Sequence, residues 1–255
     1  GRALMVGASK TATAAVLGSA GLIVTTSGAS AACTGSVGVY TCSGTMVATQ
    51  GDLNTTTTTN LLDVTVSPST TFNVTSGDAF DLDSSAGITF TNNNPEVTIT
   101  GADDGINAYH DGTYGGALSI TTTGTTTGGG DGIDAKNFGT GALSITTTGT
   151  TTGTSGYGIY AYNDANGGLT INAATTTGGN DGIKAYNKGS SALSITTTGT
   201  TTGTSGDGID AFNGYELLGS VYGTSLTINA ATTKGGDDGI YAYNYGTGAL
   251  SITTT

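Results

Sequence analysis

The stretch Gly132-Ile133-Asp134-Ala135-Lys136-Asn137, followed shortly by Leu143-Ser144-Ile145, decides the fold of this 255-residue chain. The first pattern, Gly-Ile-x-Ala-x-Asn, recurs along the chain, and its earliest copy opens at Gly105 with His110 in the Asn position. The isoleucines of successive copies are 24 to 31 residues apart: Ile106, Ile133, Ile159, Ile183, Ile209 and Ile240. Near-constant spacing of this kind indicates that each copy is one coil of a solenoid.

A second pattern, Leu-(Ser/Thr)-Ile, recurs once in every copy, and a short threonine segment such as Thr125–Thr127 completes the period. Apolar residues alternate in Ile-x-Ala and in Leu-x-Ile, so one face of each short strand points inward. Glycine, Asn and Asp clusters supply the corners between strands. The sequence therefore predicts an all-β fold, a right-handed parallel β-helix with three short strands and roughly 24 to 27 residues per coil.

The chain divides into three parts. Residues 1–31 carry Arg2 and Lys10, then the apolar stretch Thr11–Val24 and the pattern Ala29-Ser30-Ala31, which together are typical of a secretory signal peptide. A transmembrane anchor is the weaker alternative, because the apolar run is short. Residues 32–100 are expected to form an N-terminal cap and degenerate coils, and residues 101–255 regular coils of a fragment that ends within a repeat.

Cys33 and Cys42 are the only cysteines and directly follow the expected cleavage site. In an exported protein such a pair favours a disulfide that staples the first coil. A metal site of two thiolates is the alternative, but no further Cys or His lies nearby.

Composition excludes several classes of function. Six basic residues against eighteen acidic ones give a net charge of −12, which disfavours nucleic acid as a partner. Arg2 is the only arginine, and the paired acids Asp103-Asp104 and Asp237-Asp238 lack the separation across a site that glycoside hydrolysis requires. The sequence therefore predicts no catalytic residues, no cofactor and no metal, although a secreted carbohydrate-active enzyme remains an alternative.

One outward-facing row is the best candidate for ligand binding. The position between Ala and Asn of the first pattern alternates outward, so aromatic rings there could form a platform for sugar rings or for a protein. Stacked rings also stabilise neighbouring strands without any ligand, and this structural interpretation is the stronger one. Apart from Lys136, the row consists of Tyr109, Tyr162, Tyr186, Phe212 and Tyr243.

Other rows favour structural roles. The Asn row is expected to form an amide ladder with His110 at its head, and Asp-Gly turns explain the row Asp104, Asp131, Asp181, Asp207 and Asp238 better than calcium does. Threonine runs such as Thr121–Thr123 could present hydroxyl arrays similar to those that bind ice, but threonine is also ordinary on solvated strands. The longest interval contains Tyr215–Tyr222, which is expected to leave the solenoid as a loop.

The signal segment, the loop closed by Cys33 and Cys42, and the two strand patterns together resemble the passenger domains of Gram-negative autotransporters, over nearly the whole chain. The resemblance implies a secreted, surface-displayed adhesin or stalk, with an outer-membrane barrel beyond the fragment. A glycan or protein on a host or neighbouring cell is the implied partner. No catalytic residue is implied. Self-assembly into filaments through coil ends is a further alternative.

Overall fold

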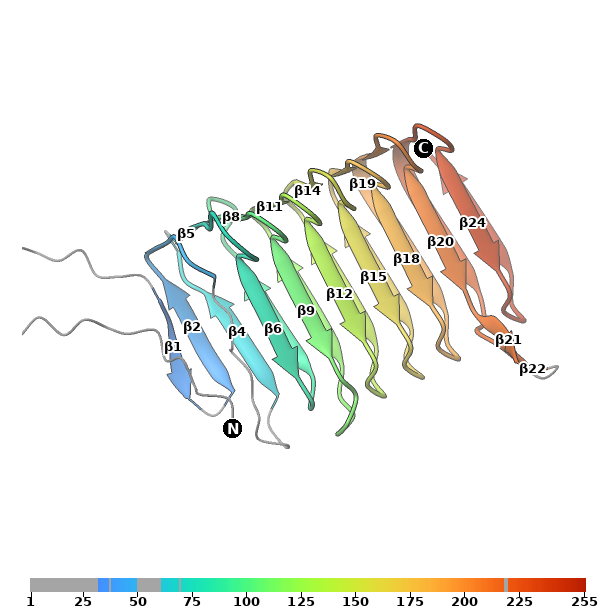
Figure 1. The fold of residues 1–255 in the computed structure, drawn as a ribbon. Coiled ribbons are helices and arrows are strands. Elements are labelled where there is room, and N and C mark those ends of the chain that lie inside the picture. The colour runs from blue at the N-terminus through green and yellow to red at the C-terminus, as the bar shows by residue number, and fades with distance from the viewer. Residues whose placement is uncertain (1–31, 37, 50–60, 69, 218–219) are drawn as a thin grey trace, which may run out of the picture.

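A computed structural model describes residues 32–36, 38–49, 61–68, 70–217 and 220–255. These residues form a parallel β-solenoid of about eight turns, in which the strands of successive coils lie side by side (Figure 1). The predicted all-β parallel β-helix with three strands per coil is confirmed. Among the described residues, no helix is long and apolar enough to cross a membrane. The expected signal peptide, residues 1–31, lies outside the described residues.

Each coil contributes one strand to each of three faces. The first face consists of β4 (Leu62–Val66), β7 (Ile88–Asn92), β10 (Leu118–Thr122), β13 (Leu143–Thr147), β16 (Leu169–Ala173), β19 (Leu193–Gly203), β23 (Leu226–Lys234) and β25 (Leu250–Thr254). Its strands from β10 onward carry the Leu-(Ser/Thr)-Ile pattern. The second face consists of β3 (Thr45–Met46), β5 (Thr71–Asn73), β8 (Thr98–Gly101), β11 (Thr125–Gly128), β14 (Thr151–Gly153) and β17 (Thr176–Gly178). Because β19 is long enough to pair with both β16 and β17, these two faces join into one sheet.

The third face is a separate seven-stranded sheet, and six of its strands carry the Gly-Ile-x-Ala-x-Asn pattern, with His110 in the Asn position of the earliest copy. Its strands are β6 (Phe80–Ser84), β9 (Ile106–His110), β12 (Ile133–Asn137), β15 (Ile159–Asn163), β18 (Ile183–Asn187), β20 (Ile209–Asn213) and β24 (Ile240–Asn244). Its register pairs like with like, so Ile133 lies beside Ile159 and Asn137 beside Asn163. Every outward row on this face is therefore a line of equivalent positions from successive coils.

The core follows the predicted alternation. Ile133, Ala135, Leu143 and Ile145 are fully buried, and their equivalents in the neighbouring coils continue the same rows. The coils before residue 101 fill the core with larger rings. The ring centroid of Phe80 lies 4.4 Å from that of Phe72 and 4.8 Å from that of Phe90. The degenerate coils thus replace the Ile-x-Ala pattern with aromatic packing.

The first described strands form a cross-linked hairpin. Strands β1 (Ala32–Ser36) and β2 (Val39–Ser43) are antiparallel, with Cys33 opposite Cys42, and the predicted disulfide joins them. Strand β2 then pairs in parallel with β4, so the hairpin is continuous with the first face of the solenoid. A covalent link therefore closes the point where the solenoid stack begins.

The predicted loop in the longest coil is a second hairpin. Strands β21 (Tyr215–Leu217) and β22 (Ser220–Tyr222) pair antiparallel and project from the corner after β20 (Figure 1). Gly214 and Gly223 flank it with positive φ angles of 81° and 92°, a conformation that glycine adopts at little cost. A Cβ on Gly223 would lie 2.8 Å from the Cα of Gly214, so glycine lets the two legs of the hairpin approach.

Candidate functional site

The outer surface of the third sheet gathers most of the aromatic side chains. The predicted row lies on it, as expected from alternation, but its exposure varies: Tyr109 and Tyr243 are 41% and 46% exposed, whereas Tyr162, Tyr186 and Phe212 are half-buried. Neighbouring rings cover these three. The structure therefore brings the predicted residues onto one face as a line of partly covered rings.

Ring contacts connect the row from coil to coil. Tyr186 and Phe212 stack with centroids 5.1 Å apart and planes at 15°. Lys136 interrupts the row between Tyr109 and Tyr162, but the ring of Phe138, which follows β12, contacts both tyrosines. Its centroid is 5.4 Å from that of Tyr109 and 5.5 Å from that of Tyr162. Such geometries add stability beyond area burial, which is consistent with the structural interpretation of the row.

A second outward row, which is mostly polar but contains Tyr160 and Tyr241, lies beside the first and was not singled out from the sequence. Tyr160 occupies the other outward position of β15, and its ring stacks on that of Tyr157 with centroids 5.4 Å apart. Burial raises the pKa of Tyr160 to about 12, so its hydroxyl stays protonated and can donate a hydrogen bond. The signal was present in the sequence, because Ile-Tyr-Ala-Tyr places tyrosines on both outward positions of one strand.

Between these rows the surface is hollowed. A shallow depression of about 450 Å³ is lined by Tyr157, Tyr160, Tyr162, Tyr186, Lys184 and Lys188. The Nζ of Lys188 lies 5.0 Å from the centroid of Tyr162, and the Nζ of Lys184 lies 5.4 Å and 5.5 Å from those of Tyr157 and Tyr186. Three ring faces of the depression are thus in cation–π range of a lysine.

The Lys184 charge is already compensated. Its Nζ donates to Asp210 at 2.6 Å and to Asp181 at 3.1 Å, and both carboxylates are buried. Burial lowers the pKa of Lys184, but these two hydrogen bonds and charges outweigh burial and hold the pKa above its usual value. An anionic ligand in the depression would therefore meet a cation that is shared between two carboxylates.

Carboxylates line the corner that leads into the third sheet. Four members of the predicted row, Asp104, Asp131, Asp181 and Asp207, accept a backbone hydrogen bond from the next coil. Examples are Asp131 N–H to Asp104 Oδ1 at 2.7 Å and Asp207 N–H to Asp181 Oδ1 at 2.8 Å. These side chains thus also form a ladder between coils. Gly156 leaves room for this, because a Cβ there would lie 2.0 Å from Asp131 Oδ1.

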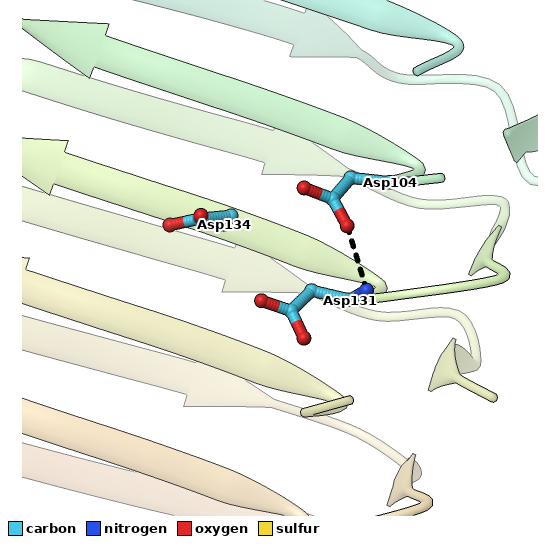
Figure 2. A group of neighbouring side chains, drawn as sticks. All are labelled: Asp104, Asp131 and Asp134. Atoms are coloured by element: carbon cyan, nitrogen blue, oxygen red, sulfur yellow. Dashed lines mark hydrogen bonds between the residues drawn. The ribbon is translucent and has the colours of Figure 1, made fainter. Parts of the chain in front are cut away.

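Three carboxylates converge at one place on this ladder. One oxygen from each of Asp104, Asp131 and Asp134 lies within 4.8 Å of the others (Figure 2). Burial, together with the charges of Asp131, Asp78 and Asp134, raises the pKa of Asp104 to about 6, although the hydrogen bond from Asp131 N–H opposes the rise. Burial also raises the pKa of Asp134, while Lys136 Nζ, 2.6 Å from its Oδ2, lowers it.

The predicted amide ladder is confirmed. Asn137 donates to Asn163 and Asn163 to Asn187, each at 2.8 Å, and the chain of bonds continues through Asn213 to Asn244. His110 heads the ladder in the interior, where its Nδ1 lies 2.7 Å from Asn137 Oδ1. His110 therefore stands at the head of the ladder, as predicted.

The threonine runs are only partly outward. Thr121 and Thr123 are half-buried at the surface, whereas Thr122 between them is buried, as are Thr126 and Thr151 of the second face. A second, smaller depression of about 220 Å³ lies among the threonines and alanines of this surface: Thr146, Thr147, Thr148, Asn172, Ala173, Ala174, Thr196 and Thr198. It offers hydroxyls and methyl groups but no ring face.

Comparisons with known protein families, with curated proteins and with solved structures found no match to this chain.

Proposed function

We propose that this chain is a non-enzymatic adhesive rod of the autotransporter-passenger type, secreted to the cell surface, whose tyrosine face binds neutral glycans. The observation that carries the proposal is the depression between Tyr157, Tyr160, Tyr162 and Tyr186. It combines ring faces, on which the C–H groups of a sugar can stack, with phenolic hydroxyls that can hydrogen-bond sugar hydroxyls. The repeat extends such positions along the solenoid, so a chain of sugars could contact several coils.

Charge favours a neutral sugar over an acidic one. Lys184 is held by Asp181 and Asp210, and the single charge of Lys188 lies on a chain whose net charge is −12. A carboxylate or sulfate on the ligand would be repelled by this surrounding charge. A flat apolar patch would indicate a protein partner. The depression is instead concave and lined only by tyrosines and lysines.

Glycan binding tests the proposal. The chain is immobilised and titrated with neutral, sialylated and sulfated oligosaccharides, and the binders are then measured by calorimetry. We expect retention of neutral glycans, and a loss of affinity of at least about tenfold in Tyr162→Ala/Tyr186→Ala, because each aromatic contact contributes on the order of 1 kcal/mol. Asn172→Ala, in the threonine depression, is the matched control and should bind normally.

Two results would reject the proposal. Equal affinity of the double tyrosine variant and the wild type would remove the tyrosine face from binding. Release of new reducing ends or unsaturated products during incubation would instead favour the alternative of a secreted carbohydrate-active enzyme. Circular dichroism of each variant shows whether the solenoid is intact.

A further inference from the structure

The repeat contains two equivalent carboxylate groups that can be compared directly. In the first, Asp104 is followed one coil later by Asp131 and Asp134. In the second, Asp181 is followed one coil later by Asp207 and Asp210. Both groups share the backbone hydrogen bond to the first carboxylate and the sequence Asp-Gly-Ile-Asp in the second coil.

A cation occupies the second group. Lys184 lies in β18 beside Asp210 of β20, and its Nζ contacts Asp181 Oδ2 and Asp210 Oδ2. The ammonium thus sits between one carboxylate of its own coil and one of the next. This is the position where a positive charge neutralises both acids.

The first group has Asn107 in the place of Lys184. Asn107 pairs with Asp134 in the register, as Lys184 pairs with Asp210. Its Nδ2 donates instead to Asp78 Oδ2, at 3.2 Å, so it bonds to the preceding coil and carries no charge. Lys136 contacts Asp134 Oδ2 and no other carboxylate of the group.

One carboxylate of the first group is both buried and incompletely bonded. Asp134 is only 8% exposed, and its Oδ1 is buried without a hydrogen-bond partner. A buried carboxylate oxygen without a partner is costly, and it calls for a cation or a water. The equivalent Oδ1 of Asp210 is also buried without a partner beside Lys184. The indication of a positively charged ligand therefore comes from the meeting of the three carboxylates and from the ammonium that occupies the equivalent position in the later coil.

We propose that Asp104, Asp131 and Asp134 bind a divalent cation, with Ca²⁺ the best match, in the position that the Lys184 ammonium occupies in the later coil. All the available ligand atoms are oxygens, which suits a hard cation. Ca²⁺ is favoured over Mg²⁺ because Ca²⁺ accepts irregular arrangements of oxygens and completes its coordination with water. The ion would link the coils of β9 and β12 and offset the repulsion between their carboxylates.

The test uses the full chain, stripped with chelator and titrated with CaCl₂ by calorimetry, with MgCl₂ in parallel. We expect one equivalent of Ca²⁺ to bind, and the thermal midpoint of unfolding to rise by about 5 °C at saturating Ca²⁺. Asn107→Lys should abolish Ca²⁺ binding, because the new ammonium can occupy the site as Lys184 does. It should also raise the midpoint without calcium, an outcome that a merely disruptive change would not give.

A further variant is the matched control. Asn107→Gln keeps the amide and should bind Ca²⁺ like the wild type. Absence of Ca²⁺-induced heat and stabilisation in the wild type would overturn the proposal. Unchanged Ca²⁺ binding in a folded Asn107→Lys would overturn it as well.

Discussion

Removing one rung of the buried amide ladder should destabilise the solenoid strongly. Asn163 makes three side-chain hydrogen bonds, each 2.8 Å long: its Oδ1 accepts from Asn137, and its Nδ2 donates to Asn187 Oδ1 and to the carbonyl of Gly167. Asn163→Ala removes all three in the interior, where water does not replace them. At about 1 kcal/mol for each bond plus the cost of unsatisfied partners, the free energy of unfolding should fall by about 3 to 5 kcal/mol.

Urea unfolding followed by far-ultraviolet circular dichroism measures this loss. Asn172→Ala is the matched control, because it removes the same amide from an exposed position of the next strand and should change stability by less than about 0.5 kcal/mol. A loss in Asn163→Ala no larger than the loss in Asn172→Ala would refute the reasoning, since it would mean that the ladder contributes nothing beyond an ordinary surface side chain.

Three further predictions concern single interactions. Thr151→Val should raise the free energy of unfolding by about 1 kcal/mol, because the Thr151 hydroxyl is buried without a partner; urea unfolding checks it, with the half-buried Thr152→Val as control. In chelator, Asp104→Asn should stabilise the chain at pH 7.5 but not at pH 3.5. The pKa of Asp104 is raised in the folded state, so the stability that this carboxyl contributes below pH 3.8 is lost as the pH rises through about 6. Unfolding curves at both pH values measure the free energy gained by the variant, and an equal gain at pH 7.5 and pH 3.5 would contradict the prediction. Cys33→Ser/Cys42→Ser should speed amide hydrogen exchange in β1, β2 and β4 and leave β15 to β20 unchanged, since each coil contacts only its neighbours; uniform acceleration along the chain would refute this.

The fold could be predicted from the sequence because every copy of the repeat carries the same information about strand orientation and register. Alternation in Ile133-Asp134-Ala135 decides which side chains face inward, and equal spacing fixes the register from coil to coil. The amide ladder and the projection of Tyr215–Tyr222 from the solenoid follow for the same reason, because the first belongs to the period and the second interrupts it, although the antiparallel pairing within the projection was not predicted. The disulfide followed instead from the two cysteines themselves. Residues 61–100 were harder to divide into coils, since Phe72, Phe80 and Phe90 pack across strands in ways that no period expresses.

The site was less predictable because it depends on pairs of residues from different coils. The aromatic row was expected, but the depression also requires Tyr157, Tyr160, Lys184 and Lys188, which belong to other rows. Asp134 was not distinguished from other polar outward residues, because its meeting with Asp104 arises only after one coil stacks on the next. The pattern of one row therefore does not predict a depression or a carboxylate group that residues of two rows form together.

Every row described above depends on stacking of the coils in register, and distances between spin labels on one row measure that stacking directly. Ser119, Thr227 and Ser251 occupy equivalent outward positions of β10, β23 and β25. Labels on Ser119→Cys/Thr227→Cys are four coils apart and on Ser119→Cys/Ser251→Cys five, so a rise of about 4.8 Å per coil predicts separations of about 19 Å and about 24 Å between the labelled backbones. Narrow distributions that differ by one coil spacing would confirm the solenoid, whereas equal or broad distances would contradict it.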